Sequence, residues 1–236
     1  MISFPSSSDA RASRTSGLLR RTVRAAAMSA AAALVAIGAV ATTGGEDAAA
    51  LERLPTNAMA PFVQNAAQQA LDGHDAYLAT DDAASYRKFV WYRAQTAAFA
   101  ATELGVPEQE MIDAWGATSE SHQRAVLAAM TQVGVPYRYN TSKPGVGFDC
   151  SGLTTFAWKK GGAELVRQST AQIRNAEQIE RDSAKAGDLV QYPGHVMMYL
   201  GVGDTIIHSV QTGRTVELDT ISERRRTTAR FGDPIA

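Results

Sequence analysis

The sequence has almost no cysteine. Cys150 is the only one in 236 residues, so the chain cannot close a disulfide within itself. A lone thiol in an exported protein is a liability unless it is buried, paired with another chain or used in chemistry. The residues around Cys150, taken up below, favour a use in chemistry.

The chain also lacks a strong excess of either charge, with a formal net charge of −1. Five arginines but only one acidic residue stand in residues 1–41, so the remainder is more acidic than the whole. A chain without a basic surface is not expected to bind nucleic acid. Hydrophobic residues make up 45%, which is enough to bury a globular core. We expect no cofactor.

No long leucine-rich run is present. The run from Ala25 to Ala41 is nearly uncharged, but it is alanine-rich and short for a helix that spans a membrane. Arginines precede it, and the small residues Ala39 to Ala41 follow, which is typical of an export signal. We therefore predict that residues 1–41 direct export out of the cytoplasm. The alternative is an uncleaved segment that serves as a membrane anchor.

Residues 42–117 show no strand-like alternation. A polar linker is expected over residues 42–53, and a helical segment of unknown role follows it. Thr80 to Asp82 can cap one helix, Gly105 can end it, and Pro107 can open the next helix. The apolar residues should dock on the domain that follows, either as a permanent structural brace, with one wall of the cleft as a further role it can take, or as a removable lid that blocks Cys150. They include Phe89, Val90, Phe99 and Trp115.

Residues 118–236 change from helical to strand-like patterns. Helices are predicted over residues 120–133 and from Cys150 to Gly161. Short apolar runs broken by glycine or proline then predict strands at residues 189–190, 196–200, 205–208 and 215–218. Helices followed by an antiparallel sheet indicate an α+β domain.

Cys150 stands where a glycine-rich loop leads into a helix. Unpaired backbone N–H groups and the positive end of the helix dipole favour the thiolate there, and the thiolate is the nucleophile. The same N–H groups can hold an oxyanion. Ser151 and Gly152 are small enough to leave room for a substrate carbonyl.

A base for this thiol is available among four histidines. His195 begins one predicted strand and His208 ends the next, so a hairpin can place them side by side. His195 would then accept the proton of Cys150, and His208 would orient its ring. The alternative is a metal site, but no ligand spacing supports one, so no metal is expected. His122 is expected to be an exposed first-turn residue, and His74 has no assigned role.

Residues 118–236 resemble the NlpC-type, papain-like cysteine peptidases of bacterial cell walls. The resemblance lies in six stretches that occur in the family's order. They are Pro136 to Tyr139, Phe148 to Leu153, Arg167 to Gln172, Gly187 to Val190, His195 to Gly201, and Ile207 to Ser209.

The resemblance implies a helical subdomain packed on a small antiparallel sheet, preceded here by the all-helical segment. It implies hydrolysis of peptidoglycan stem peptides, between γ-D-glutamate and a diamino acid, in the cell wall or periplasm. By position, Cys150 matches the nucleophile, His195 the base and His208 the third residue. Tyr137, Asp149 and Ser151 match residues near the substrate. Asp149 is also suited to cap the helix, and Tyr137 to pack against it.

Two features depart from the family pattern and affect the shape of the cleft. A compact Tyr192-Pro193-Gly194 leads into His195, and Met197-Met198 replaces smaller residues. An amidase or acyltransferase would use the same thioester chemistry, so both stay open as alternatives. A third alternative is a domain without catalytic activity that binds the cell wall or a partner. The presence of Cys150 and His195 argues against it.

Overall fold

The computed structural model describes residues 57–235, all within one compact unit of the chain, residues 49–236. The export signal expected at residues 1–41 and the linker expected at residues 42–53 lie outside the described residues. Within residues 57–235, no helix has both the length and the apolar character that crossing a membrane requires.

Three helices open the described part of the chain. They are α1 (Ala60–Thr80), α2 (Ala83–Leu104) and α3 (Glu108–Gly116). The carboxylate of Asp82 caps α2 by accepting a hydrogen bond from the backbone N–H of Ser85, and Gly105 ends α2 with a φ of 66°. Both caps were predicted from the sequence. Pro107 precedes α3 as its N-cap and does not form its first turn, so that boundary differs by one residue.

The second half combines three more helices with a sheet, which confirms the α+β fold. The helices are α4 (Glu120–Met130), α5 (Cys150–Gly161) and α6 (Ser169–Asn175), with short 3-10 turns η1 (Arg181–Ser183) and η2 (Glu223–Arg225). The helix predicted to reach Val133 ends at Met130, because turns lead from there into Gly134, whose φ is 83°.

The main sheet has six antiparallel strands in the order β3-β8-β4-β5-β6-β7. Four strands were predicted, and β3 and β8 at one edge were not. The strands are β3 (Glu177–Ile179), β4 (Leu189–Tyr192), β5 (His195–Tyr199), β6 (Thr205–Ser209), β7 (Val216–Thr220) and β8 (Arg230–Asp233). A small separate pair, β1 (Ser142–Lys143) with β2 (Gly147–Phe148), precedes α5.

Alternating residues of the sheet enter two cores. Val196, Met198 and Ile207 belong to a large core shared with the helices. Met197, Tyr199 and Ile206 belong to a smaller core on the opposite face, with Ile221 and Phe231. The helix α5, which begins at Cys150, packs on β5 and β6, the strands that carry the two histidines.

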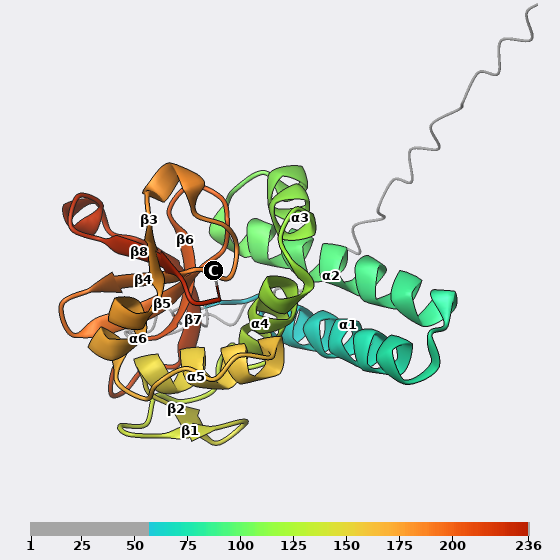
Figure 1. Ribbon diagram of the computed structural model, residues 1–236, viewed down its shortest axis with the longest axis horizontal. Coiled ribbons are helices and arrows are strands. Elements are labelled where there is room, and N and C mark those ends of the chain that lie inside the picture. Colours follow the sequence, from blue (N-terminus) through green and yellow to red (C-terminus); the bar gives the residue numbers. More distant parts are fainter. Residues whose placement is uncertain (1–56, 236) are drawn as a thin grey trace, which may run out of the picture. The chain divides into compact units, whose positions relative to one another are not determined.

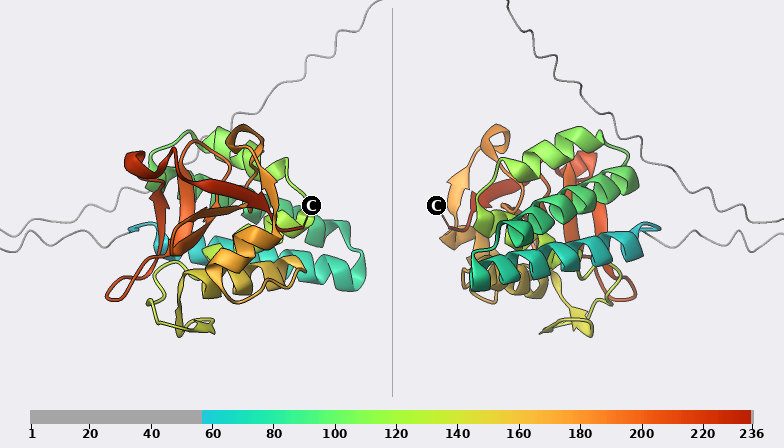
Figure 2. Two further views of the ribbon diagram at one scale, coloured as in Figure 1. Left: turned by 60° about the vertical axis from the view of Figure 1, so that its left-hand side comes forward. Right: turned by 90° about the vertical axis from the view of Figure 1, so that its right-hand side faces the viewer.

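The helices α1 to α3 pack on the rest of the unit, as their apolar residues predicted (Figures 1 and 2). Phe89 and Trp115 belong to the same buried core as the sheet residues. The indole N–H of Trp115 donates to the carbonyl oxygen of Leu200, 2.9 Å away. The side chain of Asn57 both accepts from the N–H of Leu218, at 2.7 Å, and donates to its carbonyl oxygen, at 3.1 Å. Packing is therefore continuous across residue 117, and the domain boundary placed there stays a prediction.

Candidate active site

Cys150 is the first residue of α5, and two neighbours fix this helix start. The carboxylate oxygen Oδ1 of Asp149 accepts a hydrogen bond from the backbone N–H of Gly152, 2.7 Å away. The backbone N–H of Asp149 donates to the carbonyl of Thr141, and a Cβ on Gly152 would collide with the same carbonyl oxygen. Glycine is therefore required at 152 for the loop to lie this close to the helix.

The cap leaves two backbone donors unused. A helix cannot satisfy its own first N–H groups, and Asp149 takes only that of Gly152. Within residues 57–235, the N–H groups of Cys150 and Ser151 have no hydrogen-bond acceptor. The helix start thus has the free donors that an oxyanion needs.

His195 and His208 are brought together by the hairpin of β5 and β6, as predicted. Nε2 of His195 lies 2.8 Å from Nδ1 of His208. A tight turn places His195, because Tyr192 pairs with His195 across Pro193 and Gly194, and Gly194 takes the positive φ of 83° that glycine tolerates. The Tyr192-Pro193-Gly194 sequence is thus the hairpin turn that positions the histidine.

His195 is held in its neutral form. Burial, and secondly the neighbouring His208, lower the pKa of His195 from 6.5 to about 3. A neutral imidazole can accept a proton on one nitrogen only. Since Nε2 is engaged with His208, Nδ1 is the nitrogen left for a proton from a thiol.

Cys150 opens onto a cleft of about 370 Å³. Its lining combines the helix start, the turn before His195 and two loops. It comprises Tyr137, Tyr139, Asn140, Asp149, Cys150, Ser151, Arg167, Gln168, Ser169 and Gly194. No residue of α1, α2 or α3 lines it, so the expectation that these helices form one wall of the cleft was wrong. They pack instead on one another, on α4 and on β7, within the shared core.

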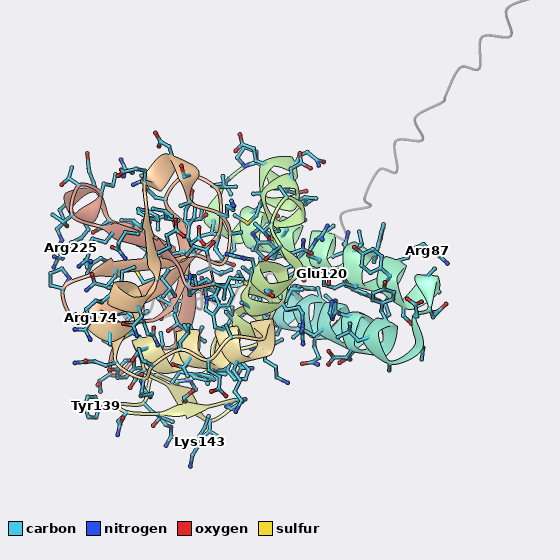
Figure 3. All side chains as sticks on the ribbon, viewed as in Figure 1. Arg87, Glu120, Tyr139, Lys143, Arg174 and Arg225 are labelled. Carbon is cyan, nitrogen blue, oxygen red and sulfur yellow. The ribbon has the colours of Figure 1, made fainter. Side chains whose placement is uncertain are left out.

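The three residues expected near the substrate all line this cleft, but two of them also have structural partners. Asp149 caps α5, as its alternative interpretation held, and Ser151 is 6% exposed. Tyr137 is half-buried, and burial, followed by the nearby Cys150 and Asp149, raises its pKa. Tyr139 extends away from the body of the unit (Figure 3) and is 86% exposed at the mouth of the cleft.

Arg167 is a cleft residue to which sequence reasoning assigned no role. Its Nη2 donates to Oδ2 of Asp149 at 2.6 Å, and its Nη1 donates to Oγ of Ser151 at 2.7 Å. Arg167 therefore balances the charge of Asp149 and ties the loop before α6 to the start of α5. Its place in one of the six family-like stretches was the available signal.

His122 is buried, which contradicts the prediction that it is exposed. Its ring packs edge-on against Trp158, and its Nδ1 lies 2.8 Å from Oγ of Ser119. Its Nε2 lies 3.1 Å from Oδ1 of Asp188 and 3.6 Å from Oδ1 of Asp233. The prediction failed because the partners of His122 lie far along the chain. Asp188 directly precedes β4, and Asp233 ends β8.

His122, Asp188 and Asp233 are the one group in residues 57–235 whose ligand atoms are close enough to hold a metal ion. Asp188 already accepts from the backbone N–H of Lys185 at 2.6 Å, and His122 has a partner on each nitrogen. Hydrogen bonds alone account for the group, which joins α4 to the sheet. It does not include His195 or His208.

Comparison with known proteins places residues 134–232 in the NlpC/P60 family, whose model matches them. A murein DD-endopeptidase of Escherichia coli K12 is 34% identical over 126 residues, which are 46% of this chain and 46% of that protein. A gamma-D-glutamyl-L-lysine dipeptidyl-peptidase of Bacillus cereus is 35% identical over 94 residues, which are 36% of this chain and 28% of that protein. The chain thus spans less than half the length of either relative.

An NlpC/P60 family protein from Bacillus cereus is 26% identical, with a TM-score of 0.45, over 49% of this chain and 40% of that one. The family model coincides with the part of the chain that carries Cys150, His195 and His208. Residues 134–232 thus carry the match to the NlpC/P60 family, and they are less than half of the chain.

Proposed function

We propose that this chain is a cysteine endopeptidase that cleaves the stem peptides of peptidoglycan. The observation that carries the proposal is the meeting of Cys150, at the start of α5, with the turn into His195 in one cleft. Cys150 stands on a helix start, and Gly194, which precedes the buried, neutral His195, lines the same cleft. A thiol at a helix start with a neutral histidine as base is the arrangement that thiol nucleophiles require. The names of the two curated relatives point to peptidoglycan peptides as the substrate class.

The reaction we propose has two stages. In the first, Nδ1 of His195 takes the proton of Cys150 while the sulfur attacks the scissile carbonyl carbon. The N–H groups of Cys150 and Ser151 stabilise the oxyanion, and His195 returns the proton to the leaving amine, which departs and leaves a thioester. In the second stage, His195 activates a water that hydrolyses the thioester and restores the thiol.

The bond we propose joins the γ-carboxyl of D-glutamate to a diamino acid such as diaminopimelate. The two relatives are named for different bonds, a DD bond and a γ-D-glutamyl bond, so the products decide. Tyr137, Asp149, Ser151 and Arg167 line the cleft on the side of the helix start and would contact the acyl part of the peptide. We also propose that the enzyme acts outside the cytoplasm, in the cell wall or periplasm.

The test is mass analysis of muropeptides after incubation with the chain from residue 42 onward. A monomeric tripeptide or tetrapeptide stem should lose its diamino acid, because the γ-D-glutamyl bond is broken. A cross-linked muropeptide dimer is tested as a second substrate. Cleavage only at its cross-link would show that the enzyme breaks a DD bond and not the γ-D-glutamyl bond. No change in either substrate, or transfer of the acyl group to an amine without hydrolysis, would contradict the proposal.

A further inference from the structure

The second ring nitrogen of His208 is buried and stands against a carboxylate. His208 is 6% exposed, and its Nδ1 is engaged with His195. Its Nε2 has no hydrogen bond within residues 57–235. Oδ2 of Asp219 lies 3.5 Å from this nitrogen, which is slightly longer than a good hydrogen bond. A buried ring N–H without a partner is costly, so a closure of this gap is favoured.

The sheet places Asp219 at this point. In the pairing of β6 with β7, His208 stands opposite Glu217 and Ile206 stands opposite Asp219. His208 and Asp219 are therefore diagonal neighbours on one face, a distance that long side chains can bridge. The side chain of Asp219 is 44% exposed, so a small rotation toward Nε2 of His208 meets little resistance.

One oxygen of Asp219 is already committed. Oδ1 accepts a hydrogen bond from the backbone N–H of Thr220, 2.7 Å away, which leaves Oδ2 for His208. The neighbouring His208 ring is the largest influence that lowers the pKa of Asp219; burial raises it, and the N–H of Thr220 and the charge of Arg214 lower it further. Arg214 forms its hydrogen bonds with Glu217 and not with Asp219. The side chain that faces Oδ2 of Asp219 is therefore that of His208.

A carboxylate accepts hydrogen bonds and does not donate them. This fixes the position of the ring proton first on His208 and then on His195. With Asp219 as acceptor, His208 carries its proton on Nε2 and offers the lone pair of Nδ1. His195 must then carry its proton on Nε2 and donate it to His208. The lone pair of Nδ1 of His195 is left free for the thiol.

We propose that Asp219 is a positioning residue that selects the reactive tautomer of His195 through His208. The effect on catalysis rests on the proposed function. The assignment of the ring protons of His195 and His208 does not depend on it. The machinery thus has four members, Cys150, His195, His208 and Asp219, of which the last touches neither substrate nor thiol. Tyr192 is an ionisable group that also lies beside His195, with ring centroids 5.5 Å apart.

The test compares Asp219→Ala and Asp219→Asn in the chain from residue 42, with Glu223→Gln as a control for the loss of an exposed carboxylate. In Asp219→Asn, the amide oxygen keeps the N–H of Thr220, so the amide nitrogen faces His208 and donates to it. This reverses every proton position in the relay and places a proton on Nδ1 of His195. Asparagine is therefore expected to be no better than alanine, although it is closer in shape.

Two readouts need no substrate. Nitrogen NMR of the imidazoles reports the tautomers of His195 and His208, and the rate of alkylation of Cys150 by iodoacetamide against pH reports the base. We expect both histidines to carry the Nε2 proton in the wild type and to shift toward Nδ1 in the asparagine variant. Alkylation, and kcat/KM on muropeptides, should fall about tenfold or more in both variants, as when the orienting partner of a ligand or base is removed.

The inference would be overturned if either Asp219 variant keeps its Cys150 alkylation rate within twofold of the wild type and its histidine tautomers are unchanged. A fall in activity with unchanged tautomers would also overturn it, because Asp219 would then act only on the fold. If the tautomers shift as expected but the wild type cleaves no muropeptide, the relay stands and the proposed function fails. Equal losses in Glu223→Gln would assign the effect to surface charge in general and would also count against the relay.

Discussion

Nε2 of His195 lies 2.8 Å from Nδ1 of His208, although 13 positions separate the two residues. Nε2 of His195 is engaged in this contact and its Nδ1 is not, whereas both nitrogens of His208 face protein groups. In the proposed mechanism, His195 is therefore the base, and His208 acts on the reaction only through His195.

The two histidines should differ in how well a substitute replaces them. His208→Gln keeps an amide oxygen that can accept from Nε2 of His195, so part of the activity should remain. His195→Gln removes the base and should lower kcat by on the order of 10³-fold or more. Muropeptide cleavage rates of both variants check the prediction. Equal losses would mean that the roles are reversed or that both residues bind a metal, and a chelator would separate these cases.

The stability of the fold should depend on pH through His195. Its pKa is about 3 in the folded chain and about 6.5 when unfolded, so only the unfolded chain takes up this proton between those values. The folded state therefore loses stability as the pH falls below about 6.5, by at most about 1.4 kcal/mol per pH unit.

Urea unfolding of the wild type and of His195→Gln at pH 6.5, 5.5 and 4.5 measures this slope. The variant should show a shallower fall, because its side chain does not titrate. This window stays above the range in which Asp219, with its lowered pKa, is protonated. Parallel slopes in the two proteins would show that His195 is not the group responsible.

Removing Trp115 should destabilise the unit, whereas removing Trp91 should not. Trp115 is 1% exposed and donates to Leu200 across the junction of α3 with the sheet, while Trp91 is 58% exposed on α2. Trp115→Ala should cost about 3–5 kcal/mol, and Trp91→Ala about 0.5 kcal/mol or less. Thermal unfolding of both variants measures the difference.

The same pair of variants separates the two roles considered for α1 to α3. A brace predicts that Trp115→Ala melts lower and, at temperatures where it is folded, cleaves muropeptides no faster than the wild type. The cleft lining supports the brace, since it includes none of these helices. A tenfold gain in cleavage, equivalent to about 1.4 kcal/mol in the barrier, would indicate a lid instead.

The start of α5, the caps of α2 and the histidine hairpin could be predicted because each depends on neighbours in sequence. Asp82, Gly105 and Cys150 stand at helix ends with local signatures, and strand alternation with a turn brings His195 to His208. Docking of the first helices followed from the size of their apolar residues.

Features that depend on distant partners could not be predicted. The environment of His122 is made by Trp158 and Asp188, so its helix position alone indicated exposure. The strands β3 and β8 are short and weakly alternating, and they form only by pairing with each other and with β4. Asp219 acquires its contact with His208 from the register of β7, which a sequence pattern does not specify.

The central claim is that the sulfur of Cys150 attacks a stem-peptide bond. The most direct measurement compares the wild type with Cys150→Ala on one purified muropeptide, with products weighed by mass spectrometry and the fold of both proteins checked by thermal unfolding. We predict cleavage by the wild type, a loss on the order of 10³-fold or more in the variant, and a similar melting temperature for both. Undiminished cleavage by a folded Cys150→Ala protein would contradict the account.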